Sequence, residues 1–272
     1  PHLNSLKSEG LYFSRFYANS YRTDRGLVSI LMGYPSPASV SLMKFPRKTA
    51  TMPSLAAHLS KADYDLNYYY GGDADFTNMR SFLINQGFKN ITEDANFPVT
   101  DRLSKWGVPD HLLFAKAKND LTAQAKAGFR DIKTRRPAFT VIQTSSSHEP
   151  FDVPYHRLSN PILNAFAYTD ACVGDFIKYL KAAGRWNQSL IILVPDHLGA
   201  WPRNADSFKS WRFHVPLIWT GGAIKRPDVV PVYGSQQDIA ATLLGQLGIN
   251  HQDMTFSKDL FSFFFHHSAF FM

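Results

Sequence analysis

The sequence contains a single cysteine, Cys172, among its 272 residues. One cysteine excludes an intrachain disulfide, a zinc site built from several thiolates and a paired redox motif. The residues around Cys172 follow an apolar helical pattern, which favours a packed small hydrophobe over a catalytic nucleophile. No apolar run approaches the roughly twenty residues that a membrane-spanning helix requires.

Basic residues are also poorly clustered, although the formal net charge is +7 at pH 7. Arg135-Arg136 is the closest arginine pair, and no longer basic run exists, so the composition does not favour a nucleic-acid partner. Several common enzyme motifs are missing as well. There is no Gly-x-Ser-x-Gly elbow, no phosphate-binding P-loop, no His-Glu-x-x-His, and no Gly-x-Gly-x-x-Gly after a strand.

What the chain does contain is a regular alternation of strand-like and helix-like segments. Strands are predicted at residues 11–17, 66–70, 138–143, 189–194 and 215–219. Helices are predicted at residues 3–10, 26–32, 53–59, 78–85, 111–129, 163–183 and 238–247, with residues 90–110 irregular. The apolar run at 138–143 is typical of a parallel strand buried on both faces, and the run at 189–194 is the clearest strand in the sequence. The alternation predicts one α/β domain over residues 1–272, with a mostly parallel sheet flanked by helices.

The stretch from Ser20 to Pro35 places Thr23 just before the apolar segment Gly26–Met32, which Gly33 and Pro35 then end. A hydroxyl at a helix N-terminus lies beside unpaired N–H groups and the positive end of the helix dipole, where a phosphate is favoured. The simpler alternative is that Thr23 is only an N-cap.

Two further segments carry polar side chains directly after apolar strands. Asp196 and His197 follow the run at 189–194, and a carboxylate beside an imidazole suits a divalent metal, although such a pair is also common as a hydrogen-bonded loop. His148 lies in the polar loop after the run at 138–143. If Thr23 lies at the same sheet end as Asp196, a metal there would activate its hydroxyl without a separate base.

Six segments, in order, resemble one known family. They are 4–34, Tyr-Gly-Gly-Asp at 70–73, Trp-Gly-Val-Pro-Asp at 106–110, Ser-Ser-His-Glu-Pro-Phe at 146–151, Val-Pro-Asp-His at 194–197 and Gln-Asp-Ile-Ala-Ala-Thr-Leu-Leu at 237–244. Together they are similar to the lipoteichoic acid synthases, phosphoglycerol transferases of the sulfatase and alkaline phosphatase superfamily. The resemblance covers nearly the whole chain and implies a three-layer fold with a central sheet between helices.

The resemblance also implies roles for individual residues. Thr23 would be the nucleophile, carrying a phosphothreonine-type intermediate, and a metal ligand together with Asp196 and His197. His148 would act catalytically on the substrate phosphate or leaving oxygen. The remaining substrate-binding residues would be Trp106, Asp110, His214 and Arg22, of which His214 can equally be structural and Arg22 can equally be a solvated surface charge.

The implied cofactor is a divalent ion, Mn²⁺ or Zn²⁺ or else Mg²⁺, and the implied substrate is an anionic phospholipid or glycan. The domain would lie outside the cytoplasmic membrane of a bacterium, facing the periplasm or exterior. Because the first residues already have a helical pattern, we expect a longer protein whose preceding region holds the membrane spans and the family's first, acidic metal ligand. Without that ligand we expect weak metal binding.

Two other departures bear on the reaction. Leu198 separates Asp196-His197 from Gly199, where the family usually has Asp-His-Gly. Sulfatases of the superfamily mature a Cys or Ser within Cys-x-Pro-x-Arg to formylglycine, whereas this chain has Thr23 followed by Asp24. Sulfate hydrolysis is therefore disfavoured. The alternatives that stay open are phosphoethanolamine transfer, phosphodiester or sulfate ester hydrolysis, and an inactive domain that binds anionic glycans or lipids.

Overall fold

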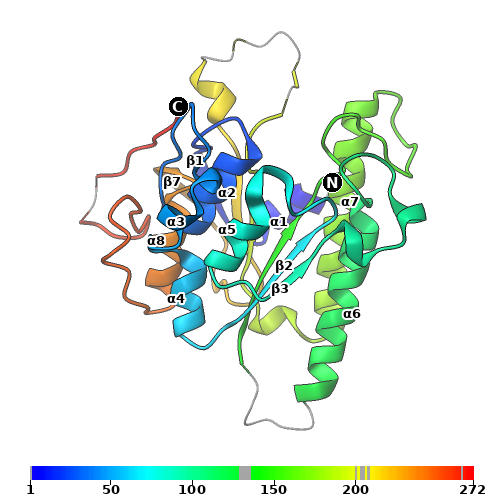
Figure 1. Cartoon of the computed structure of the whole chain (residues 1–272). Coiled ribbons are helices and arrows are strands. Elements are labelled where there is room, and N and C mark those ends of the chain that lie inside the picture. The colour runs from blue at the N-terminus through cyan, green and yellow to red at the C-terminus, as the bar shows by residue number, and fades with distance from the viewer. Residues whose placement is uncertain (1, 129–135, 200, 203–205, 207–208, 265) are drawn as a thin grey trace. The chain divides into compact units, whose positions relative to one another are not determined.

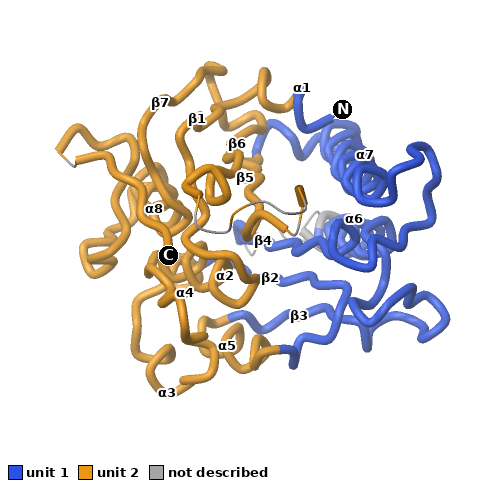
Figure 2. The backbone as a smooth tube through the Cα atoms, turned by 90° about the horizontal axis from the view of Figure 1, so that it is seen from above, with its two compact units in different colours: residues 1–5, 63–76, 88–188 blue, residues 6–62, 77–87, 189–272 orange. Residues whose placement is uncertain are grey.

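The computed structural model describes residues 2–128, 136–199, 201–202, 206, 209–264 and 266–272 (Figure 1). The described residues form two compact units, each assembled from several stretches of the chain (Figure 2). The first unit comprises residues 1–5, 63–76 and 88–188, and the second comprises residues 6–62, 77–87 and 189–272.

The second unit contains a four-stranded sheet in the order β5-β6-β1-β7. Its strands are β1 (Leu11–Tyr17), β5 (Ile191–Leu193), β6 (Leu217–Thr220) and β7 (Asp228–Ser235). Strand β6 pairs antiparallel with both β1 and β5, and β7 pairs parallel with β1. Strands β1, β5 and β7 therefore run in one direction and end at the same edge, where β6 begins.

Three helices of the second unit, α2 (Thr23–Met32), α4 (Leu55–Lys61) and α8 (Asp238–Gln246), pack against one another. Helix α2 ends at Gly33, whose φ of 61° is the left-handed conformation that glycine adopts at helix C-termini. The side chain of Ser54 caps α4 by accepting a hydrogen bond from the Ala57 N–H at 3.0 Å. The shorter helices are α1 (His2–Ser8), α3 (Pro46–Thr49) and α5 (Met79–Asn85).

The first unit contains a parallel three-stranded sheet in the order β3-β2-β4, built from β2 (Asp65–Tyr70), β3 (Asn90–Thr92) and β4 (Ala138–Gln143). The long helices α6 (Asp110–Gly128) and α7 (Pro161–Ala182) lie side by side in the same unit (Figure 1). Tyr69 of β2 packs with Leu113 and Ala117 of α6, which fixes that helix against the sheet. Short 3-10 segments occur at residues 42–44, 76–78, 94–96, 99–101, 186–188 and 210–213.

The aromatic C-terminal segment packs on the sheet of the second unit. The ring of Phe261 lies 5.8 Å from that of Phe13 and 6.0 Å from that of Trp219, between ring centroids. Farther along, Phe271 stacks on Tyr17 and Phe213.

The predicted α/β class, with sheets flanked by helices, is confirmed, but four details differ. The predicted irregular region contains β3, and β7 was not predicted. The apolar run that forms β4 is only partly buried, because this strand lies at the edge of its sheet. Thr23 is the first residue of α2 rather than its cap, since Arg22 occupies the N-cap position. Within the described residues, no helix combines the length and apolarity needed to span a bilayer.

Candidate active site

One edge of the sheet in the second unit gathers polar residues from four chain segments. Thr23 follows β1, Asp196 and His197 follow β5, Gln236 follows β7, and His214 precedes β6. Open α/β sheets place their sites beyond the carboxyl ends of parallel strands, and three of these segments leave the sheet there. This strand order places Thr23 and Asp196 at the same end of the sheet, which is the condition stated above for activation of the Thr23 hydroxyl by a metal.

His197 lies within contact distance of both Thr23 and Asp196. The Thr23 Oγ1 atom is 3.3 Å from His197 Nε2, and that nitrogen is 3.5 Å from Asp196 Oδ2. The backbone N–H of His197 also donates to Asp196 Oδ1 at 3.0 Å. The Thr23 hydroxyl is thus directed to a histidine instead of capping its own helix, and no side-chain hydrogen bond caps α2.

The second ring nitrogen of His197 determines what Nε2 can do. Nδ1 lies 3.0 Å from the Leu198 carbonyl oxygen. A carbonyl only accepts hydrogen bonds, so Nδ1 carries a proton, and in the neutral form of the ring the lone pair is on Nε2. That lone pair faces the Thr23 hydroxyl, which donates to it, and it is equally the atom with which a neutral histidine binds a metal.

Two residues hold the Asp196 backbone in this position. A Cβ built on Gly26 would lie 2.3 Å from the Asp196 carbonyl oxygen, so helix α2 approaches that backbone at a distance that only glycine permits. The buried amide of Gln236 donates from Nε2 to the Pro195 and Asp196 carbonyl oxygens at 2.8 and 2.7 Å. Its Oε1 accepts from the backbone N–H of Asn19 at 2.9 Å, which ties the ends of β1, β5 and β7 together.

Gln236 was not identified from the sequence because the strand before it was not predicted. Strand β7 is interrupted by Pro231, is mostly exposed along its first six residues and pairs with β1 through an irregular register, so its pattern is weak. With β7 recognised, a polar pair at its carboxyl end is the signal that would have indicated Gln236.

The two other predicted residues of this unit have different surroundings. The half-exposed Arg22 side chain pairs through Nε with Asp24 Oδ1 at 3.3 Å. His214 Nε2 donates to the Ser14 carbonyl oxygen at 2.9 Å, and its ring lies 5.3 Å from that of Tyr17. The contacts of His214 are therefore with β1, at the same sheet edge as Thr23.

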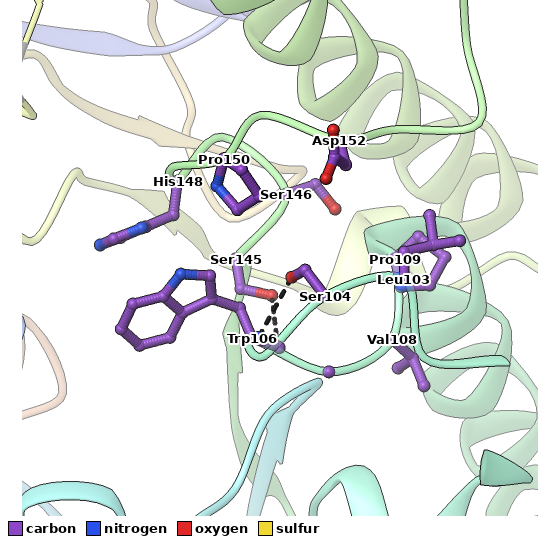
Figure 3. Close-up of a pocket in the computed structure, with 11 residues that line it drawn as sticks. Leu103, Ser104, Trp106, Val108, Pro109, Ser145, Ser146, His148, Pro150 and Asp152 are labelled. Atoms are coloured by element: carbon purple, nitrogen blue, oxygen red, sulfur yellow. Dashed lines mark hydrogen bonds between the residues drawn. The ribbon is translucent and has the colours of Figure 1, made fainter. Parts of the chain in front are cut away.

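Trp106 and His148 lie in the first unit, where they form part of a surface recess with an empty volume of about 250 Å³ (Figure 3). The recess is lined by Leu103, Ser104, Trp106, Gly107, Val108, Pro109, Ser145, Ser146, His148, Pro150 and Asp152. The Trp106 and His148 rings are 4.2 Å apart between centroids. The Trp106 Nε1 atom is buried and has no hydrogen-bond partner among the described residues.

Asp110 occupies a different environment from the one expected of a residue that lines a substrate pocket. Its side chain has 0% exposure, and it is absent from the residues that line the recess. Its carboxylate bonds to the Ser145 and Ser146 backbone and to Thr169. The recess is reached by its neighbour Pro109 instead.

Cys172 is buried in α7, as its apolar surroundings predicted. Burial, and next the nearby negative charge of Asp110, raises the pKa of the Cys172 thiol to about 12. A thiol with such a pKa remains protonated at neutral pH and is a poor nucleophile.

The described residues contain no group of three or more His, Cys, Asp or Glu side chains able to hold a metal. Asp196 and His197 supply two side chains of this kind. The Thr23 hydroxyl, 3.3 Å from His197 Nε2, adds a third donor atom. Carboxylate, imidazole and hydroxyl donors suit Mn²⁺ and Zn²⁺ by type.

Two solved structures share the fold over 96% of this chain, each with a TM-score of 0.85. One is a protein in the alkaline phosphatase superfamily from Vibrio parahaemolyticus, 27% identical in sequence, of which the match covers 64%. The other is the lipoteichoic acid synthase LtaP from Listeria monocytogenes, 21% identical, of which the match covers 69%.

Curated relatives carry related names. The lipoteichoic acid synthase-like YvgJ of Bacillus subtilis is 22% identical over 298 residues, covering 96% of this chain and 46% of that protein. Phosphoglycerol transferase I of Salmonella arizonae is 25% identical over 217 residues, covering 73% of this chain and 28% of that protein. The chain thus spans less than half the length of these relatives. Because both relatives are named as enzymes, the comparisons support an enzymatic function. The resemblance seen in the sequence is confirmed, and because the sulfatase family model matches residues 1–249, the chain belongs to the sulfatase family.

Proposed function

We propose that this chain is a metal-dependent phosphotransferase that moves the phosphoglycerol head group of an anionic phospholipid through a phosphothreonine ester on Thr23. The observation that carries the proposal is the convergence of the Thr23 hydroxyl with His197 Nε2 at 3.3 Å, beside Asp196, at the N-terminus of α2. The names of the relatives, lipoteichoic acid synthase and phosphoglycerol transferase, support the substrate class.

The donor atoms fit a divalent ion by chemical type, and we assign its binding to Asp196, His197 and Thr23. A bound ion would supply Lewis acidity, lowering the pKa of a neighbouring hydroxyl and offsetting the negative charge that develops on phosphate oxygens. His197 Nε2 has one lone pair, so ion binding and the hydrogen bond from Thr23 exclude each other there. The Leu198 carbonyl holds the proton on Nδ1 in either case.

In the first step, the Thr23 Oγ1 atom loses its proton to solvent and bonds to phosphorus, and the bond from phosphorus to the diacylglycerol oxygen breaks. The leaving oxygen takes up a proton, for which the resemblance implies His148. In the second step an acceptor hydroxyl attacks phosphorus and releases Thr23. Thr23 is the first residue of α2, so the positive end of the helix dipole lies beside it and favours the phosphate negative charge.

The fixed surroundings of Thr23 explain why this hydroxyl can react in preference to others. Gly26 and Gln236 hold the Asp196 backbone against α2, so the donor atoms are positioned before substrate arrives. Positioning of this kind supplies a large share of catalytic power in phosphoryl transfer, because the protein forms few new bonds itself.

Release of diacylglycerol from phosphatidylglycerol vesicles, with Mn²⁺ added, tests the proposal on the full chain. Thr23→Ala should abolish release and Thr23→Ser should retain part of it, because serine keeps the hydroxyl. Ser29→Ala is the matched control, since it removes a buried hydroxyl from the same helix that has no partner among the described residues. Undiminished release by Thr23→Ala contradicts the nucleophile assignment.

Parallel substrates separate the alternative reactions. Phosphatidylethanolamine vesicles test phosphoethanolamine transfer, and an aryl sulfate tests sulfate ester hydrolysis. We expect phosphatidylglycerol to be used and the sulfate to be inert, because a threonine cannot mature to formylglycine. Hydrolysis of the sulfate alone would overturn the proposal, as would binding of phosphatidylglycerol without any turnover when Mn²⁺ saturates the protein.

A further inference from the structure

Asp110 is a fully buried carboxylate at the start of α6, beside the recess that Trp106 and His148 line. Its Oδ1 atom accepts hydrogen bonds from the backbone N–H groups of Ser145 and Ser146 at 3.0 and 3.2 Å. Its Oδ2 atom accepts from Thr169 Oγ1 at 2.7 Å. A buried carboxylate with both oxygens bonded inside the protein has no acceptor directed to a ligand in the recess.

The bonding between Asp110 and the Ser145–Ser146 loop is reciprocal. The Asp110 backbone N–H donates to Ser146 Oγ at 2.9 Å, while Ser146 N–H donates back to the Asp110 side chain. A second link lies nearby, where Ser145 Oγ donates to the Trp106 carbonyl oxygen at 3.4 Å (Figure 3). The loop after β4 is thus attached at several points to the segment that precedes α6.

The same loop carries His148 to the recess. The His148 N–H donates to the Ser145 carbonyl oxygen at 3.1 Å, so the position of Ser145 is transmitted to His148 within one turn. The His148 side chain is exposed and its ring lies 4.2 Å from the Trp106 ring between centroids. The loop backbone and Trp106 therefore orient this ring, and the Asp110 carboxylate anchors the loop through the Ser145 and Ser146 N–H groups.

The negative charge of Asp110 is compensated where it lies. Two backbone N–H groups bond to it, and it occupies the first turn of the long helix α6, where the dipole favours an anion. The groups that compensate this negative charge all belong to the same unit. A carboxylate that faced an anionic phosphate would repel it. Both facts favour a role in holding the loop over a role in contacting substrate.

We propose that Asp110 is a positioning residue, which fixes the Ser145–His148 loop and thereby sets His148 against Trp106 in the recess. The proposal rests on the proposed function only for the use of His148 in catalysis. The anchoring of the loop is a property of the fold that can be measured in the absence of turnover.

Asp110→Asn and Asp110→Ala separate the two roles. Asparagine keeps an oxygen for the Ser145 and Ser146 N–H groups, and its NH₂ can donate to Thr169 once that hydroxyl rotates. Alanine removes every acceptor. A positioning role therefore predicts rescue by asparagine, whereas a role that needs the negative charge predicts that asparagine fails as badly as alanine.

Hydrogen–deuterium exchange of the peptide covering residues 144–151 is the readout that does not depend on activity. We expect Asp110→Ala to accelerate exchange there by about tenfold or more, because two amides lose their acceptor, and Asp110→Asn to stay within about threefold of the parent. Asp120→Asn is the control, since Asp120 also lies on α6 but bonds to Tyr69 and Lys116. It should leave exchange of the loop unchanged.

Turnover of phosphatidylglycerol completes the test. Asp110→Ala should lower kcat by about 100-fold with a smaller change in KM, which is the expected effect of a displacement of about 1 Å in a catalytic group. Asp110→Asn should retain most of kcat. Unchanged loop exchange in Asp110→Ala overturns the proposal, and so does an asparagine variant with normal loop exchange but the kcat of the alanine variant.

Thr169→Val provides a second route if the alanine variant does not fold. Valine has nearly the shape of threonine but cannot donate to Asp110 Oδ2. We expect it to accelerate exchange in residues 144–151 by about threefold, and normal exchange in this variant contradicts the proposal. If no variant or parent shows turnover while exchange responds as expected, the proposed function fails and the anchoring by Asp110 stands.

Discussion

Substitution of Gly26 by alanine tests whether α2 must lie directly against the Asp196 backbone. In an exposed helix the change to alanine stabilises by about 1 kcal/mol. Here the added Cβ would lie 2.3 Å from the Asp196 carbonyl oxygen, about 1 Å less than an ordinary contact. The atom it meets is backbone, held by the Gln236 amide, so it cannot rotate away. We expect α2 and the Asp196 segment to separate by about 1 Å.

The expected consequences differ for stability and for catalysis. Overpacking of this kind costs about 1–3 kcal/mol, partly offset by the helix preference of alanine, so Gly26→Ala should unfold at only a slightly lower temperature. A displacement of about 1 Å between Thr23 and Asp196-His197 should lower the rate of diacylglycerol release by about 100-fold. Activity should therefore fall far more than stability.

The matched control is Gly245→Ala in α8 of the same unit. A Cβ there would lie 2.6 Å from Asp259 Oδ2, which is the end of a side chain that can move aside. We expect near-parental release of diacylglycerol from this variant in the vesicle assay. If Gly26→Ala also keeps its rate within about threefold, the close approach of α2 to Asp196 is unimportant and the reasoning from glycine is refuted.

Two further predictions follow from buried groups. Gln236→Glu keeps the acceptor for the Asn19 N–H but replaces two donated hydrogen bonds by repulsion from the Pro195 and Asp196 carbonyls. We therefore expect weaker binding of Mn²⁺ in calorimetric titration and a free energy of unfolding in urea that is lower by about 2 kcal/mol. Parental affinity for Mn²⁺ would show that Gln236 does not position Asp196. Burial raises the pKa of the Cys172 thiol to about 12, so the thiol should stay protonated at pH 8. We expect it to resist maleimide labelling at pH 8 until urea unfolds the protein. Rapid labelling of the folded chain would refute its burial.

Much of the fold was predictable because apolar runs and helix-ending glycines are local signals. The bounds of β1 and β4 were predicted to the residue, and Gly33 was identified as the end of α2. Strands β3 and β7 were missed because one is only three residues long and the other contains Pro231 and is largely exposed. Neither strand has the continuous apolar pattern on which the prediction depended.

The site was partly predictable for a related reason. Asp196 and His197 were singled out because they follow a strand-like run, and the resemblance to a known family joined Thr23 to them as a set. The bonding direction of a side chain is not encoded in such a pattern. Asp110 was expected in a pocket wall, and its carboxylate instead bonds to the Ser145 and Ser146 backbone, which no spacing in the sequence reveals.

The central claim is that Thr23 carries the phosphorylated intermediate, and the most direct measurement is peptide mass spectrometry of the full chain quenched in acid during turnover. Cleavage after lysine releases one peptide, residues 8–44, that contains Thr23. With phosphatidylglycerol and Mn²⁺ present, fragmentation of this peptide should locate a glycerol-phosphate ester on Thr23, and Thr23→Ala should show none. Turnover without a modified Thr23, or with the ester on another residue, would contradict the account.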